Sequence, residues 1–84
     1  MPITDLEKDI LKDLLDSGYV GKRYTPVENV SKGFPKHLRG DVKKAVKNLI
    51  RKGFILEHPT SHGMDVTLPI ERTKEIKELL RLLW

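Results

Sequence analysis

Residues 36–55 read KHLRGDVKKAVKNLIRKGFI, and this stretch decides the fold. Its apolar residues recur at helical spacing and fall on one face of a helix: Leu38, Val42, Ala45, Val46, Leu49 and Ile50. Gly53 is suited to end this helix, and Phe54 and Ile55 after it indicate the start of a strand. The sequence therefore predicts a helix that begins between Lys36 and Arg39, ends at Lys52 and leads into a strand.

The opposite face of this helix is almost uniformly basic. From Lys32 to Lys52 the chain has 8 of its 16 Lys and Arg residues and a single acidic residue, Asp41. At about 100° per residue, five residues project away from the apolar stripe: Gly40, Lys43, Lys44, Lys47 and Arg51. Two interpretations stay open: a solvated face, for which Lys is the usual residue, or a surface that binds a polyanion. Gly40 either precedes the true helix, with Asp41 in the first turn, or lets a phosphate approach the backbone.

Two shorter helices are predicted before this stretch. Thr4-Asp5-Leu6-Glu7 forms a capping box that opens the first helix. Ser17-Gly18 ends that helix, with the glycine as a left-handed C-cap. Thr25 is the predicted N-cap of a short second helix and Pro26 its first position. Gly33-Phe34-Pro35 breaks the second helix, with the Phe expected to fill the core at the turn.

Two strands and a last helix are predicted after the basic stretch. Residues 54–58 and 64–68 have the composition of strands, and residues 59–63 between them are turn formers. Residues 71–84 again have apolar residues at helical spacing. The order of elements predicts one α+β domain over residues 1–84, in which residues 1–70 form the core and hairpin and residues 71–84 form an added helix.

Residues 45–55, AVKNLIRKGFI, resemble the end of the recognition helix and the first wing strand of winged helix-turn-helix DNA-binding domains. The predicted order of elements matches that fold over nearly the whole chain, which is similar to the small stand-alone winged-helix proteins of archaea. The resemblance implies a three-helix core, a two-stranded wing and an extra C-terminal helix. The predicted turn between the second and third helices, residues 31–37, is longer than is usual in the family.

The resemblance also implies a function, that of a DNA-binding transcriptional regulator. Helix 36–52 would enter the major groove, and the wing tip at residues 59–63 would contact the flanking backbone. Arg39 is the candidate for a bidentate contact with guanine, whereas Lys side chains contact phosphates. RNA binding and protein–protein contact within a larger complex are the alternatives. The predicted DNA-binding residues are Lys36, His37, Arg39, Lys43, Lys44, Lys47, Arg51, Thr60, Ser61 and His62.

The composition argues against several other classes of protein. The chain has no cysteine, which excludes disulfides, thiolate zinc sites and cysteine nucleophiles. His58 and His62 flank a turn without further ligands, so we predict neither a metal site nor a cofactor. No phosphate-binding Gly-rich loop or nucleophile with a base is present, and we expect no enzyme activity. Without a signal peptide or an apolar run of about 20 residues, we expect a cytoplasmic protein.

The predicted last helix has more apolar residues than one packed face requires: Leu79, Leu80, Leu82, Leu83 and Trp84. They either cover the first helix and complete the core, or form the seam of a dimer. A dimer would let two copies contact two DNA half-sites. We expect a homodimer through residues 71–84.

Overall fold

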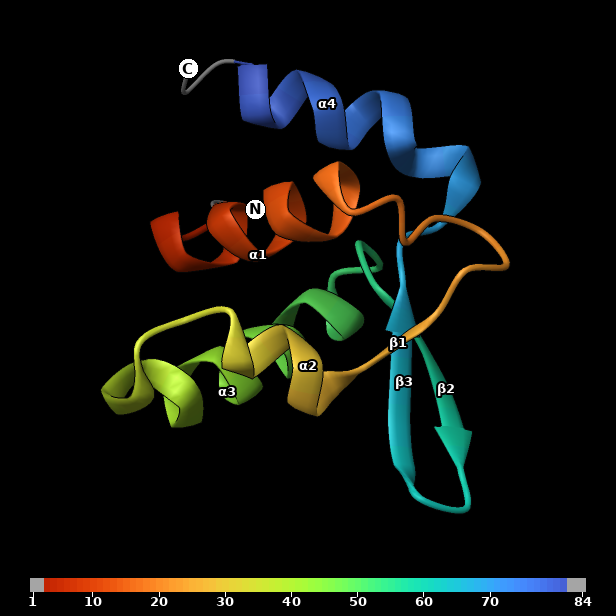
Figure 1. The fold of residues 1–84 in the computed structure, drawn as a ribbon. Coiled ribbons are helices and arrows are strands. Elements are labelled where there is room, and N and C mark those ends of the chain that lie inside the picture. The colour runs from red at the N-terminus through yellow and green to blue at the C-terminus, as the bar shows by residue number, and fades with distance from the viewer. Residues whose placement is uncertain (1–2, 82–84) are drawn as a thin grey trace.

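The computed structural model describes residues 3–81 and gives an α+β fold, as predicted (Figure 1). Short 3₁₀ turns at Lys36–Leu38 and Ile70–Arg72 precede the third and fourth α-helices. The described strands are β1 (Thr25–Pro26), β2 (Leu56–Thr60) and β3 (Gly63–Thr67). The described α-helices are α1 (Asp5–Asp16), α2 (Val27–Lys32), α3 (Arg39–Arg51) and α4 (Thr73–Arg81).

The first helix begins and ends as the sequence predicts. In its capping box, the Glu7 N–H donates to Thr4 Oγ1 at 3.1 Å and the Thr4 N–H donates to Glu7 Oε1 at 2.9 Å. Gly18 adopts a φ of 78°, the left-handed conformation in which a side chain would be strained. Figure 1 shows α1 between α4 on one side and α2 and α3 on the other.

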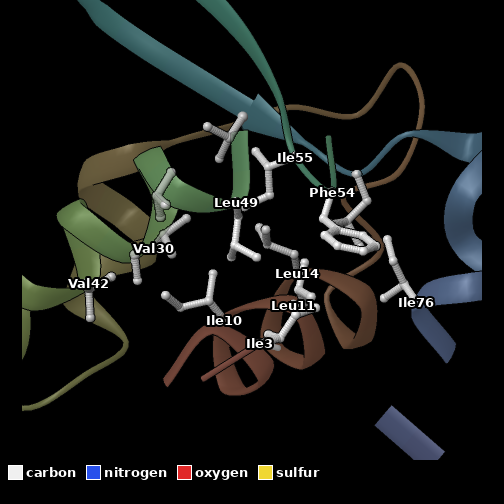
Figure 2. Packing of buried hydrophobic residues seen from close by; sticks show 14 of the residues in the cluster. Ile3, Ile10, Leu11, Leu14, Val30, Val42, Leu49, Phe54, Ile55 and Ile76 are labelled. Carbon is white, nitrogen blue, oxygen red and sulfur yellow. The ribbon is translucent and has the colours of Figure 1, made fainter. Parts of the chain in front are cut away.

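The hydrophobic core is built around α1. Ile10, Leu11 and Leu14 of this helix are at most 1% exposed. The predicted apolar face of α3 packs into the same cluster, with Leu38 and Ile50 partly buried at its edges. Figure 2 shows the side chains of α1 and α3 meeting in one cluster, which residues beyond α3 also enter. This packing fixes which side of α3 faces solvent.

The start of α3 excludes one of the two interpretations of Gly40. The helix begins at Arg39 after a 3₁₀ turn that starts at Lys36, in agreement with the predicted start. Gly40 therefore lies inside the helix, and the prediction that the helix starts after it is wrong. Asp41 is in the first turn, as expected. A Cβ at Gly40 would meet no atom within 4 Å, so packing among the described residues does not require a glycine.

The second helix differs from the prediction at its start. Thr25 is not its N-cap but a residue of β1, 3% exposed and paired with Val66. Pro26 takes the N-cap position, and α2 begins one residue later than predicted, at Val27. The pairing with β3 draws Thr25 into the sheet, and its side chain is buried there. The predicted break at residues 33–35 is confirmed, with Phe34 partly buried against the core.

The sheet also differs from the predicted two-stranded hairpin, because β1 joins it in the order β1-β3-β2. All described pairings in it are antiparallel. The predicted first strand, 54–58, is displaced: Phe54 and Ile55 are buried in the core, and β2 starts at Leu56. Pro59 was expected in the turn but pairs with Met64 in the ladder. A proline is tolerated there because β2 lies at the edge of the sheet.

The last helix completes the core of the single chain. Ile76 is fully buried and Leu80 is 6% exposed, so this part of its apolar stripe covers α1. The sequence predicts a helix up to residue 84, but residues 82–84 lie outside the described residues. The predicted contribution of Leu82, Leu83 and Trp84 to a dimer seam therefore also lies outside them. The homodimer stays a prediction. Among residues 3–81, no helix is long and apolar enough to cross a membrane.

Candidate nucleic-acid interface

The charges of the chain are separated along its sequence. Residues 22–52 contain ten of the 16 Lys and Arg residues and two of the 12 acidic residues, which gives this segment +8 and the rest of the chain −4. The segment supplies α2, α3 and the turn between them. In contrast, α1 has five acidic residues and two lysines, and the β2–β3 hairpin has neither Lys nor Arg. The positive charge that could attract a polyanion is therefore concentrated on α3 and the turn before it, with Lys22 and Arg23 ahead of β1, whereas Glu28 and Lys32 leave α2 neutral.

Four cations share the solvent side of α3, and we call them the basic face: Lys43, Lys44, Lys47 and Arg51. All four are exposed, as the sequence predicts. Their orientation follows from the opposite side of the helix, which is held against α1 by buried Val, Ala and Leu side chains. The basic face is thus displayed on a helix that is rigidly packed rather than on a mobile loop.

An acidic residue of α2 reaches one member of the basic face. Lys43 Nζ lies 3.2 Å from Glu28 Oε1, and both side chains are well exposed, at 46% and 67%. An exposed pair of this kind contributes only about 0–1 kcal/mol to stability. The pair matters more for the charge of the surface than for stability, because the Glu28 carboxylate offsets one of the four positive charges of the basic face. This pairing could not be predicted from the sequence, because the two residues lie on different helices.

Lys52, the last cation of the basic stretch, points into the protein. Its Nζ lies 3.0 Å from Glu7 Oε1 and 3.1 Å from Oε2, and the two side chains are 17% and 2% exposed. Burial disfavours the charged carboxylate of Glu7, but hydrogen bonds from Thr4 and the contact with Lys52 outweigh burial and lower its pKa below the ordinary value of 4.5. Lys52 is therefore a structural residue that joins the end of α3 to the start of α1.

The residues before and at the start of α3 are displayed unequally. Lys36 and His37 are exposed in the 3₁₀ turn, next to α3 in the chain. Arg39, the predicted guanine contact, is partly buried. Its Nε atom is buried and makes no hydrogen bond within residues 3–81. The guanidinium edge that includes this N–H is therefore not presented to solvent in this conformation.

The tip of the β2–β3 hairpin exposes the three predicted wing residues, Thr60, Ser61 and His62. The turn itself uses the Thr60 hydroxyl, which donates to the Gly63 carbonyl at 3.2 Å and accepts from the His62 N–H at 3.3 Å. Beside the tip, a hollow between α2 and the hairpin has a lining that includes Glu28 and Asp65. Figure 1 shows the tip, α2 and α3 all on the side of the molecule away from α4.

The remaining histidine of the hairpin, His58, has a structural contact. The centroid of its ring lies 4.8 Å from the centroid of the Tyr24 ring, and Tyr24 is the residue just before β1. Among residues 3–81, no three His, Asp or Glu side chains come together in a way that could hold a metal ion.

Arg72 is a residue whose role the sequence did not reveal. Its Nη1 donates to the Lys52 carbonyl at 3.0 Å, and its guanidinium carbon lies 4.1 Å from the centre of the Phe54 ring. The same side chain pairs with Glu75 at 2.8 Å. By donating to the carbonyl of the C-cap residue Lys52, Arg72 caps the C-terminal end of α3. The last helix is thereby tied to the helix that bears the basic face.

Comparisons of the sequence with protein-family models and with curated proteins, and of the fold with solved structures, found no match.

Proposed function

We propose that this protein binds nucleic acid, and specifically duplex DNA, through the basic face of α3 in a winged-helix arrangement. In this arrangement α3 is the recognition helix and the β2–β3 hairpin is the wing. The order of the elements supports the assignment, because three α-helices precede the hairpin and α3 is joined to β2 by the short connection of residues 52–55.

The observation that carries the proposal is the concentration of positive charge on one packed helix. Lys44, Lys47 and Arg51 are exposed, and the structure shows no ion pair for them among residues 3–81. Lysines four positions apart repel one another in the free protein, and phosphate groups would remove that cost. A cationic helix supported by a rigid core can approach a duplex without first becoming ordered, so less free energy is lost on binding.

The test compares two double charge reversals in a DNA-binding assay. Lys44→Glu/Lys47→Glu reverses two charges of the basic face, whereas Lys74→Glu/Lys77→Glu reverses two exposed charges of α4 and changes the net charge equally. Fluorescence anisotropy with a labelled duplex should show binding lost in the first variant and nearly retained in the second. Equal losses would indicate that net charge alone attracts DNA, and retained binding in the first variant would place the interface elsewhere.

Two further measurements separate this proposal from its alternatives. Structured RNA that competes more strongly than duplex DNA would favour an RNA-binding protein. Absence of binding to either nucleic acid at low salt would favour a protein–protein contact module. A role in transcription, expected from the resemblance to winged-helix regulators, stays a prediction.

A further inference from the structure

We infer that the basic face holds duplex DNA by its phosphate backbone, with little discrimination between base sequences. The inference rests on the proposed function and specifies its ligand as the sugar-phosphate backbone rather than a particular operator. It follows from which cations are exposed, from the state of Arg39, and from the absence of cations in the hairpin.

The central exposed cations of α3 have the wrong chemistry for base recognition. Base edges in the major groove are distinguished by paired donors and acceptors, chiefly by Arg with guanine and by Asn or Gln with adenine. The central cations of the basic face are Lys43, Lys44 and Lys47, whose ammonium groups act as point charges suited to phosphates. The chain has no glutamine, and the exposed α3 residues of a type that can read bases, Asn48 and Arg51, both lie in the C-terminal half of the helix.

The N-terminal part of α3 offers little for base contacts. This is the part of a recognition helix whose side chains contact base edges. Arg39 is partly buried with its Nε inside the protein, Gly40 has no side chain, and Asp41 is an exposed anion that would repel nearby phosphates. The exposed cations of α3 that have no ion pair among the described residues, Lys44, Lys47 and Arg51, therefore lie further along the helix. There they can contact successive phosphates of one DNA strand.

The hairpin does not add a second electrostatic contact. Between Lys52 and Arg72 the sequence has no Lys or Arg, and it has the two acidic residues Glu57 and Asp65 before Glu71. Thr60, the hydroxyl-bearing residue at the start of the turn, already hydrogen-bonds within it. The charge that attracts DNA is thus confined to the segment that ends at α3.

The number of available cations sets the expected dependence on salt. Five cations of residues 32–52 are exposed and have no ion pair within the described residues: Lys32, Lys36, Lys44, Lys47 and Arg51. If three to five of them contact phosphates, the slope of log K against log salt is about −3 to −4.5. Affinity would then fall roughly 60- to 500-fold between about 50 and 200 mM salt.

The experiment measures sequence discrimination and salt dependence on the same protein. Full-length protein is titrated by anisotropy into unrelated duplexes of equal length, including an AT-only and a GC-only duplex, and a random duplex pool is carried through repeated selection. We expect affinities within about threefold of one another, no enriched motif, and the slope given above. A selected sequence that binds more than about 100-fold tighter than the pool would overturn the inference while leaving the proposed function intact. Failure to bind any duplex at low salt would overturn the proposed function itself.

Discussion

Replacing Lys52 by Met should destabilise the protein strongly, because it leaves Glu7 charged and buried. The carboxylate is 2% exposed and would lose an ammonium group that lies 3.0 and 3.1 Å from its two oxygens. Only the contacts with Thr4 would remain of those that lower the pKa of Glu7. Removing one partner of a buried ion pair costs about 3–5 kcal/mol, a large part of the roughly 5–15 kcal/mol that holds a small domain folded.

The effect of pH distinguishes this mechanism from a simple loss of packing. In the wild type the pKa of Glu7 is lowered on folding, so the ionised carboxylate stabilises the fold. That stability is complete above the ordinary pKa of 4.5 and is lost as the pH falls through the lower, folded-state pKa. In Lys52→Met, both contributions of Lys52 that lower the pKa of Glu7 are lost while burial still raises it, so the pKa is higher than in the wild type. The deficit of the variant relative to wild type should therefore shrink as the solution is acidified.

Urea denaturation followed by circular dichroism, from about pH 3 to about pH 8, measures both effects. The double variant Glu7→Gln/Lys52→Met should recover most of the loss, since a glutamine can still accept the Thr4 N–H in a capping box. Lys12→Met is the matched control, because its 2.8 Å pair with Asp16 is exposed on α1 and should matter little. A Lys52→Met variant within about 1 kcal/mol of wild type at neutral pH would refute the reasoning, as would a double variant less stable than the single one.

Three other predictions follow from contacts of the basic face and of α4. Glu28→Gln should release Lys43 from its 3.2 Å ion pair, strengthen DNA binding severalfold and steepen the salt slope by up to about one; an unchanged anisotropy titration would contradict this. Truncation after Thr73 should unfold the chain, because it removes two buried side chains worth about 1.5–3 kcal/mol each; a truncated protein with a cooperative thermal transition would show that α4 is dispensable. Gly53→Ala should cost about 1–2 kcal/mol, since the residue has a φ of 79° and its Cβ would lie 2.7 Å from Arg72 Nη1; a melting temperature equal to wild type would argue against a strained turn.

Local signals in the sequence predicted the helices well. The capping box at Thr4 and the apolar spacing of α3 each depend on residues within a few positions of one another, and both were confirmed. The strands were predicted less well because their limits depend on distant partners. Thr25 joins the sheet by pairing with Val66, a contact that no local pattern announces. Pro59 can be part of β2 because this strand lies at an edge of the sheet. The order of the strands depends on contacts between distant segments and cannot be predicted from any single segment.

The exposure of four cations on one face of α3 was predicted correctly, but the number of cations without an acidic partner was not. Helical spacing separates the exposed cations from the apolar stripe, and that separation needs no tertiary information. Which acidic residue meets which lysine does need it. Glu7 lies 45 positions from Lys52, and Glu28 reaches Lys43 from another helix, so the sequence could not show that either cation has a partner.

The adjacent residues Arg51 and Lys52 show why this matters for function. Arg51 faces solvent as part of the basic face, whereas Lys52 is the C-cap residue of α3 and points toward Glu7 in the core. If all eight cations of residues 32–52 contacted phosphates, the salt slope would be about −7 and affinity would fall roughly 20,000-fold between about 50 and 200 mM salt. The five that remain after Lys52, Lys43 and the half-buried Arg39 are removed give at most about −4.5. A salt titration therefore tests the described packing of α3 together with binding. A slope steeper than this requires phosphate contacts beyond these five, either from the paired or buried cations turned outward on DNA or from exposed cations outside residues 32–52 such as Lys22 and Arg23.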